Sequence, residues 1–372
     1  MKVYNDHNVY IVGAGFSRNK GVPIVRNFLD VMRNASEYFE HLGEKEIVQQ
    51  MNDVFEFRHK SAGAAYRTNL NIEDIEQLFS LASAQNANRL DKSIIESISA
   101  TIDYATMVGE TEKIKLFVEK AKLNKIPTFH SLGSSREFSN LDFELGNVSR
   151  YDLMHLLMLN LFEKPTELKN NAIISFNYDL VIEESLKALN IPFHYGVKRT
   201  HFSDSGYCDI TNGFSLLKLH GSINWTRGRR GQSLNIHSSY KEAKESKLTK
   251  ILLPPTWQKT FHGPFQQVWS AAIDEIKKAT RLIVLGFSLP ETDIHFKYLL
   301  SAGLSDNISL REIFFVNPEP PETYRPKLEK VFQHNFLRDK YVKHISSTIE
   351  MAFSSEQFLK DINRNSASYV YS

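Results

Sequence analysis

Cysteine is nearly absent from this 372-residue chain, which contains a single one, Cys208. One thiol excludes an intramolecular disulfide and every zinc site that needs two or more thiolates. A protein that uses no disulfide suits a reducing compartment. We therefore expect a cytoplasmic protein and a functional site without zinc or another metal.

Long apolar runs and net charge are also lacking. No stretch of about 18 uninterrupted apolar residues occurs, so we expect no segment that spans a membrane. The 45 Lys and Arg residues balance 43 Asp and Glu residues to a formal charge of +2. This balance gives no basic footprint for sequence-independent binding of nucleic acid, so we expect any DNA involvement to be indirect, through a partner.

Short apolar runs are present, and they predict the fold. Each is rich in branched residues, ends at a glycine or a polar residue, and is followed by a helix-like pattern, which is what a parallel sheet covered on both faces requires. We predict an α/β fold with a Rossmann-like parallel sheet, helices on both faces and a large all-α insertion. The predicted strands are Asn8 to Val12, Ala172 to Phe176, Ser215 to Leu219, Leu282 to Leu285, Ile313 to Val316 and a late one from Tyr341 to Ile345.

The domain boundaries follow from where this pattern is interrupted. Residues 36–164 contain apolar positions at helical spacing and no convincing strand, so we interpret them as a helical insertion. Residues 1–35 and 165–365 then form one sheet domain, followed by a C-terminal tail, residues 366–372. The length fits one domain with a large insertion better than two tandem domains.

Residues 226–250 are polar and lysine-rich, with three arginines close together at their start. We predict a surface loop there. Contact with nucleic acid is the alternative interpretation of the arginines.

A glycine-rich turn follows the first predicted strand, with the sequence Gly13-Ala14-Gly15-Phe16-Ser17. Glycines let the main chain approach a pyrophosphate, and the N-terminus of a following helix supplies N–H groups to hold it. Arg18 stands where the usual dinucleotide fingerprint has its third glycine, which disfavours a hydride-transferring dehydrogenase. A tight turn that binds no ligand is the alternative.

Small or polar residues follow four other predicted strands, and the carboxyl ends of parallel strands share one edge of a sheet. Taken singly, each has an ordinary explanation, such as helix capping for an asparagine or aspartate. Coincidence at all five strand ends is much less expected than at any one. The four further groups are Asn177 with Asp179, His220, Gly286 with Ser288, and Asn317.

These residues together resemble the sirtuin superfamily, and more closely its zinc-free bacterial branch found in antiviral defence. The resemblance runs from Gly13 to Glu319 in the same order. The matching blocks are Gly13 to Ser17, Gly21-Val22-Pro23 with Arg26, Asn177-Tyr178-Asp179, His220-Gly221, Gly286-Phe287-Ser288 and Val316-Asn317.

Three departures from the sirtuin pattern matter for the substrate. No cysteine follows His220, so the four-cysteine zinc module of the deacylases cannot exist here. Ile24 and Val25 replace an aspartate and a phenylalanine of the nicotinamide-facing lid, and Phe176 replaces a glutamine. These changes weaken the case for acyl-lysine substrates and leave the dinucleotide site largely intact.

The resemblance implies an NAD+ glycohydrolase that cleaves NAD+ to nicotinamide and ADP-ribose, acting as an antiphage effector that depletes NAD+. It implies that Asn177, Asp179 and His220 are catalytic, with His220 as general base. The NAD+-holding residues it implies are Gly13, Ala14, Gly15 and Ser17 at the pyrophosphate, Gly286, Ser288 and Asn317 on the adenosine side, and Arg26 at a phosphate or ordering the loop.

The resemblance also implies how such an enzyme is controlled. We expect a homo-oligomer that is activated by a partner, and among relatives a separately encoded HerA-like hexameric ATPase is one such partner. The alternatives are an NAD-dependent protein deacylase or ADP-ribosyltransferase, and a non-enzymatic subunit that binds NAD or ADP-ribose within a nucleic-acid-processing complex.

Overall fold

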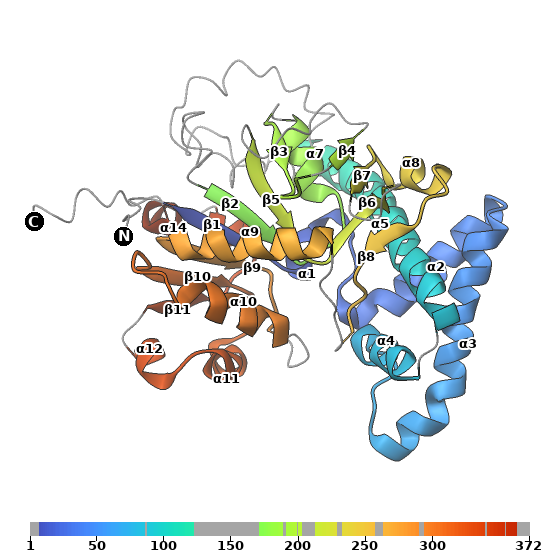
Figure 1. Ribbon diagram of the computed structural model, residues 1–372, viewed down its shortest axis with the longest axis horizontal. Coiled ribbons are helices and arrows are strands. Elements are labelled where there is room, and N and C mark those ends of the chain that lie inside the picture. The colour runs from blue at the N-terminus through green and yellow to red at the C-terminus, as the bar shows by residue number, and fades with distance from the viewer. Residues whose placement is uncertain are drawn as a thin grey trace, which may run out of the picture.

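The centre of the molecule is a seven-stranded parallel sheet (Figure 1). The computed structural model describes residues 7–85, 88–122, 171–188, 191–198, 200–202, 213–228, 233–256, 263–289, 294–338, 341–353 and 355–362. The strands in spatial order are β11 (Val342–Ile345), β10 (Glu312–Val316), β9 (Arg281–Leu285), β1 (Asn8–Val12), β2 (Asn171–Ser175), β5 (Phe214–Lys218) and β3 (Phe193–His194).

Burial explains why these runs form strands. Every residue of β1, β2 and β9 is buried, as expected for central strands of a sheet that is covered on both faces. The six strands predicted from apolar runs are confirmed to within one residue at each end. In the described part of this seven-stranded sheet, the two-residue edge strand β3 was the one strand missed, because so short an element leaves no periodic pattern.

The strand order places a topological switch beside β1. From β1 the sheet extends through β2 to β5 in one direction and, later in the chain, through β9 to β11 in the other. The pairings align Val12 with both Ser175 and Leu285, and they align Ser175 with Lys218 and Leu285 with Val316. Five strand ends therefore meet at one edge, where ligands bind in open sheets of this class.

Helices cover both faces of the sheet, as β10 illustrates. Adjacent residues of a strand point to opposite faces. The Phe314 ring contacts Phe358 with centroids 5.9 Å apart, while the Phe315 ring lies 6.1 Å from Tyr324 and 6.4 Å from Phe296. The helices of this half are α9 (Pro264–Lys278), α10 (Ile294–Leu304), α11 (Pro321–Val331), α12 (His334–Arg338), α13 (Ile349–Phe353) and α14 (Glu356–Ile362).

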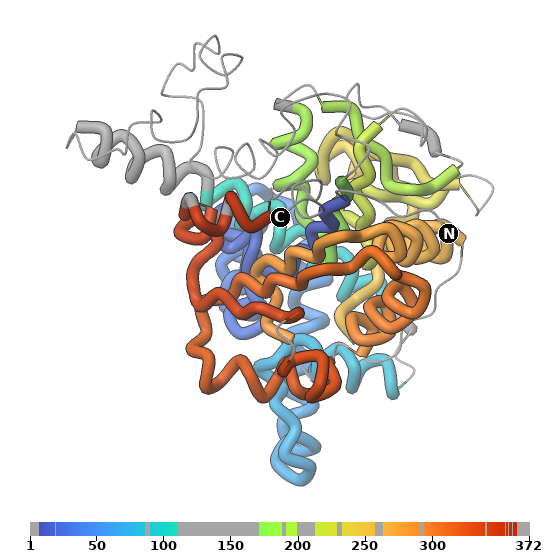
Figure 2. The backbone as a smooth tube through the Cα atoms, turned by 90° about the vertical axis from the view of Figure 1, so that its left-hand side faces the viewer, coloured from blue at the N-terminus to red at the C-terminus, as the bar shows by residue number. Residues whose placement is uncertain are grey.

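A group of helices lies between β1 and β2 in the chain and to one side of the sheet (Figures 1 and 2). Ile75, Leu78 and Phe79 are buried in α4, which confirms the helical spacing predicted there. Residues 123–164 of the predicted insertion and the predicted tail, residues 366–372, lie outside the described residues. The described helices are α2 (Phe28–His41), α3 (Lys45–Thr68), α4 (Ile75–Ala84) and α5 (Asn88–Lys122). None of the helices in the described ranges has both the length and the apolar character needed to cross a membrane.

The segment 226–250 is not a surface loop, contrary to the prediction. Its buried residues include Leu234, Ile236, Tyr240 and Ala243, which belong to a short strand and a short helix. The polar residues around them mask the apolar pattern in the sequence. A second sheet has the order β4-β7-β6-β8, and Ser239 caps the short helix beside it through a bond from the Glu242 N–H. These elements are β4 (Thr200–Phe202), β6 (Gly221–Arg227), β7 (Leu234–Ile236), α8 (Tyr240–Glu245) and β8 (Lys250–Leu252).

Candidate active site

The turn after β1 leads into a single turn of α-helix, α1 (Ala14–Ser17), which continues as the 3-10 helix η1 (Arg18–Lys20). The chain then reverses at Gly21, whose φ is 87°. The glycine-rich turn is therefore followed by a much shorter helix than the sequence suggests. Ala14 and Gly15 are partly exposed, whereas Phe16 and Ser17 are buried.

The glycines of this turn interlock with the loop after β9. The Gly15 N–H donates to the Gly286 carbonyl oxygen at 2.9 Å, and the Gly13 N–H donates to the Leu285 carbonyl oxygen at 3.0 Å. A Cβ at Gly286 would lie 2.3 Å from the Phe16 nitrogen, and its φ of 63° also disfavours any other residue. Close packing of two strand ends therefore accounts for Gly13, Gly15 and Gly286 before any ligand is considered.

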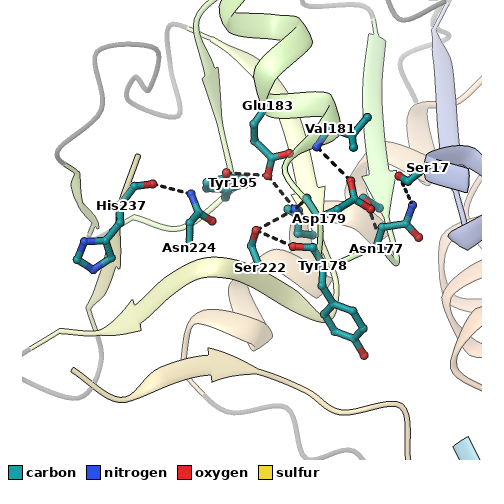
Figure 3. A network of polar contacts seen from close by, with 12 residues as sticks. Ser17, Asn177, Tyr178, Asp179, Val181, Glu183, Tyr195, Ser222, Asn224 and His237 are labelled. Atoms are coloured by element: carbon teal, nitrogen blue, oxygen red, sulfur yellow. Dashed lines mark hydrogen bonds and ion pairs between the residues drawn. The ribbon is translucent and has the colours of Figure 1, made fainter. Parts of the chain in front are cut away.

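Asn177 joins the end of β2 to the glycine turn. Its amide nitrogen donates to the Gly13 carbonyl oxygen at 2.9 Å and to the Ser17 hydroxyl at 3.1 Å, and Figure 3 shows the amide turned toward Ser17. Because a carbonyl oxygen can only accept, this contact fixes which end of the amide faces the turn. The side-chain oxygen of Asn177 receives no hydrogen bond from the described residues and is left as an acceptor.

Asp179 is buried two residues further on, with 3% of the residue exposed. One carboxylate oxygen accepts the Val181 N–H at 3.1 Å at the start of α7 (Val181–Ala188), whereas the other, Oδ2, accepts no hydrogen bond from a described residue. Burial raises the pKa of Asp179, and the Lys218 ammonium and the Ser17 hydroxyl partly oppose that effect. A buried, half-satisfied carboxylate costs stability, which is typical of a functional group.

His220 follows β5 and reaches the same region through aromatic contacts. Its ring lies edge-on to Phe176 with centroids 5.2 Å apart, and the Phe176 ring lies 4.9 Å from Phe287. Phe287 in turn lies beside the glycine turn, because a Cβ at Gly13 would be 2.6 Å from its ring. The Trp269 indole donates to the Leu219 carbonyl oxygen at 3.1 Å and so fixes the main chain just before His220.

The structure thus brings Ser17, Asn177, Asp179 and His220 together at one edge of the sheet, but the predicted adenosine-side residues differ in character. The Asn317 amide donates to the Phe287 carbonyl oxygen at 3.0 Å, and its side-chain oxygen accepts the Glu319 N–H at 2.8 Å. Ser288 is exposed, and so is Arg26 in the 3-10 helix η2 (Val25–Asn27). Asn317 therefore connects the ends of β9 and β10, whereas Ser288 and Arg26 are exposed at the surface.

The sequence analysis did not identify a buried ion pair, Lys218 with Glu183, that contacts the main chain of Asp179. The Lys218 ammonium contacts Glu183 at 2.8 Å, with 1% and 2% of the two side chains exposed. The Lys218 ammonium also donates to the Ser222 hydroxyl, and Tyr195 donates to Glu183; Glu183, Tyr195 and Ser222 are labelled in Figure 3. The available signal was a lysine inside an otherwise apolar strand, since such a residue is almost never buried without a partner.

The arrangement supplies two polar acceptors, an imidazole and an aromatic wall at the carboxyl edge of a parallel sheet. Such a set suits a substrate that carries a positive charge or develops one, because the carboxylate and amide oxygens can face it. Within the described ranges, no group of three or more His, Cys, Asp and Glu residues is placed to hold a metal ion.

Comparisons with known proteins agree in part with these observations. Residues 171–345 match the family model described as the SIR2-like domain, and no curated protein matches the chain. Among solved structures, a mutant Sir2 homologue in complex with 2'-O-acetyl ADP ribose is 12% identical with a TM-score of 0.43, covering 97% of this chain and 93% of that one. A Sir2 homologue in complex with NAD is 13% identical with a TM-score of 0.40, covering 97% and 90%.

The matched segment begins at β2, so it contains Asn177, Asp179, His220, Ser288 and Asn317 but not the glycine turn after β1. The hydrogen bonds from Asn177 to Gly13 and Ser17 connect that turn to the matched segment. What these comparisons show is a match between residues 171–345 of this chain and the SIR2-like domain.

Proposed function

We propose that this protein is an NAD+ glycohydrolase that cleaves NAD+ to nicotinamide and ADP-ribose. The observation that carries the proposal is the placement of Asn177 and Asp179: the Asn177 amide nitrogen holds the glycine turn, and two residues further on the buried Asp179 carboxylate keeps Oδ2 without a hydrogen bond from the described residues. The SIR2-like match over residues 171–345 supports the same substrate class.

The reaction replaces one bond at the nicotinamide ribose. Water attacks the anomeric carbon as the carbon–nitrogen bond to nicotinamide breaks, and the bonding electrons leave with the neutral nicotinamide. Positive charge develops on the ribose, so a fixed carboxylate and fixed dipoles lower the barrier. In this proposal, Asp179 faces the developing cation and the Asn177 oxygen orients the ribose or the water.

The attacking water also loses a proton, which gives His220 a role. An imidazole exchanges protons near neutral pH and is the commonest general base. Phe176 packs edge-on to the His220 ring, and the Leu253 N–H donates to the His220 carbonyl oxygen at 2.9 Å, so both ring and main chain are held. His220 accepts the proton from water and releases it to solvent after nicotinamide has left.

The residues present fit NAD+ in part. The unpartnered Asp179 Oδ2 and the Asn177 oxygen suit the nicotinamide-ribose end, and the exposed Ser288 and Arg26 side chains suit the polar remainder of the dinucleotide. The role proposed for Asn317 is then indirect, because its side chain already holds the loops after β9 and β10. Gly286 acts in the same indirect way, through the interlock with the glycine turn.

Product analysis tests the proposal. Purified protein is incubated with NAD+, with and without the products of neighbouring genes, and nicotinamide and ADP-ribose are quantified. The wild type should release both in equal amounts, and His220→Ala and Asn177→Ala should lower the rate by about 100-fold or more. Addition of an acetyl-lysine peptide should not be required; a strict requirement would favour the deacylase alternative.

Regulation belongs to the same proposal. An enzyme that depletes NAD+ harms its own cell unless it is held inactive, so we propose an antiphage effector in the cytoplasm that works as a homo-oligomer. A HerA-like ATPase is the proposed activator, and DNA would then be engaged by that partner. Light scattering of the purified chain and co-purification with such an ATPase test these points.

A further inference from the structure

Lys218 is the only charged residue of β5, and it stands two residues before His220. Its side chain is 1% exposed, so the ammonium group has left water almost completely. Burial of an unpaired ammonium is expensive, and the other residues of β5, three apolar ones and Ser215, need no charge at this position. Its partners therefore indicate why a lysine stands there.

Those partners tie three elements together around the end of β2. The Lys218 ammonium donates to the main-chain oxygen of Asp179, to the Ser222 hydroxyl at 2.9 Å and to a Glu183 carboxylate oxygen at 2.8 Å. The Ser222 hydroxyl in turn donates to the Tyr178 carbonyl oxygen at 3.2 Å (Figure 3). One ammonium group thus holds the Asp179 carbonyl directly and the Tyr178 carbonyl through the Ser222 hydroxyl.

The cluster contains two acidic residues, Asp179 and Glu183, and one basic residue, Lys218. The Glu183 oxygen Oε1 accepts hydrogen bonds from the Lys218 ammonium and, at 2.9 Å, from the Tyr195 hydroxyl. The other oxygen, Oε2, accepts no hydrogen bond from the described residues. Lys218 forms an ion pair with Glu183 and also lowers the pKa of Asp179, and all three residues are at most 3% exposed. Without the ammonium, no described cation would oppose the effects of burial and of Glu183 on the Asp179 carboxyl.

Stability alone does not explain such a cluster, because a buried ion pair contributes little more than apolar residues of similar volume. Lys250 offers a comparison within the molecule. It is 2% exposed and pairs with Glu96, so it links β8 to α5 in the same way. The distinguishing feature of Lys218 is its contact with the Asp179 main chain and its closeness to the Asp179 carboxyl.

We propose that Lys218 is a positioning residue for the candidate active site: it fixes the Tyr178–Asp179 main chain and places a positive charge beside the Asp179 carboxyl. This proposal rests on the proposed NAD+ cleavage, in which an ionised Asp179 faces the ribosyl cation.

The groups that face Asp179 predict the sign of each perturbation. Burial raises the pKa of Asp179; Lys218 from β5, Ser17 from α1 and the Val181 N–H from α7 lower it, and Glu183 from α7 raises it. Loss of the Lys218 charge should therefore move the Asp179 titration to higher pH. Loss of the Glu183 charge should move it to lower pH.

The test compares Lys218→Met, Glu183→Gln and the matched control Lys250→Met. Nicotinamide release is followed against pH, and the Asp179 carboxyl is titrated by NMR in aspartate-labelled protein, with its resonance assigned from Asp179→Asn. For Lys218→Met, kcat should fall about 10- to 100-fold and the acid limb of the rate profile should move to higher pH. Lys250→Met should lower the Tm but leave kcat and the acid limb in place.

Two results would overturn the proposal. One is a Lys218→Met variant that loses Tm as Lys250→Met does while its kcat and Asp179 titration stay as in the wild type. The other is a shift of the Asp179 titration in the same direction for Lys218→Met and Glu183→Gln, which a structural disturbance would produce. If Lys218→Met does not fold, Glu183→Gln still tests the electrostatic argument. Its Asp179 titration should move to lower pH, and a titration that stays in place or moves to higher pH would contradict the proposal.

Failure of the proposed function is a separate outcome. If the wild type binds NAD+ and releases no nicotinamide, NAD+ cleavage is wrong. The opposite titration shifts of Asp179, measured without turnover, would then still support the electrostatic role of Lys218, whereas their absence would contradict it.

Discussion

The strand ends on the two sides of β1 carry similar residue types and use them differently. After β9 and β10, both ends of the Asn317 amide are hydrogen-bonded to main chain and Gly286 is packed against the glycine turn. After β2, the Asn177 oxygen and Asp179 Oδ2 accept nothing from the described residues. One side uses its polar groups to connect the strand ends, and the other leaves polar acceptors without partners among the described residues.

The two sides are expected to contribute to the free energy of unfolding with opposite signs. A satisfied buried amide contributes about 1 kcal/mol for each hydrogen bond, whereas a buried carboxylate with one free oxygen costs free energy. Substitutions on the β9 and β10 side should therefore lower stability first. Substitutions at Asp179 should lower turnover first, which makes the comparison testable by measuring both quantities on each variant.

The largest expected effect is that of Gly286→Ala. A Cβ there would lie 2.3 Å from the Phe16 nitrogen and 2.5 Å from the Gly15 carbon, so one of the two loops must move. We expect a loss of about 3 kcal/mol or more in the free energy of unfolding, measured by denaturant titration. Gly43→Ala is the matched control: its φ of 75° is similar and nothing lies within 4 Å, so it should cost about 1 kcal/mol. Equal losses in the two variants would contradict the interlock.

Asp179→Asn should separate function from stability. We expect turnover to fall about 100-fold, because the variant has no carboxylate to face the developing cation. The pKa of Asp179 is raised in the folded protein, so its contribution to stability is present at low pH and is lost as pH rises through that value. The variant should therefore be at least as stable as the wild type at neutral pH, and its advantage should disappear on acidification.

Asp103→Asn is the control for this prediction. Asp103 lies on α5, and burial raises its pKa to about 6 while Lys250 and Lys244 oppose the shift. The same sign applies, so this variant should gain stability above pH 6 in thermal melts. Its turnover should stay at the wild-type level; a large loss would mean that carboxylates are equally sensitive across the molecule.

Asn317→Ala should have the smallest of the three effects and the opposite character. It removes the bonds to the Phe287 carbonyl oxygen and the Glu319 N–H, so we expect a loss of about 2 kcal/mol in the free energy of unfolding. Turnover should change only a few-fold, mainly through KM. Ser288→Ala is the exposed control and should stay within about 0.5 kcal/mol of the wild type. A turnover loss in Asn317→Ala as large as that in Asp179→Asn would remove the distinction between the two sides.

The sheet could be predicted well because its strands are buried on both faces and so appear as continuous apolar runs. The second sheet could not, because β4, β7 and β8 have three residues each and polar neighbours. In residues 226–250 polar and charged residues dominate the composition, and the burial of Leu234 and Ile236 is what reveals a strand.

The places of these residues at the strand ends could be predicted from the sequence, but their contacts could not. Spacing placed Asn177, His220 and Asn317 at strand ends, and the parallel sheet brings those ends together. That Gly15 packs against Gly286, and that Lys218 sits behind Asp179, depends on contacts between segments far apart in the chain. No local pattern encodes them.

The most direct measurement is the fate of NAD+ incubated with the purified protein, and with its activating partner, in water enriched in oxygen-18. The account predicts equal amounts of nicotinamide and ADP-ribose, one oxygen-18 atom at the anomeric position of ADP-ribose, and loss of both products in His220→Ala. Bound NAD+ that stays intact under every activating condition, or ADP-ribose transferred to protein without incorporation of water oxygen, would contradict it.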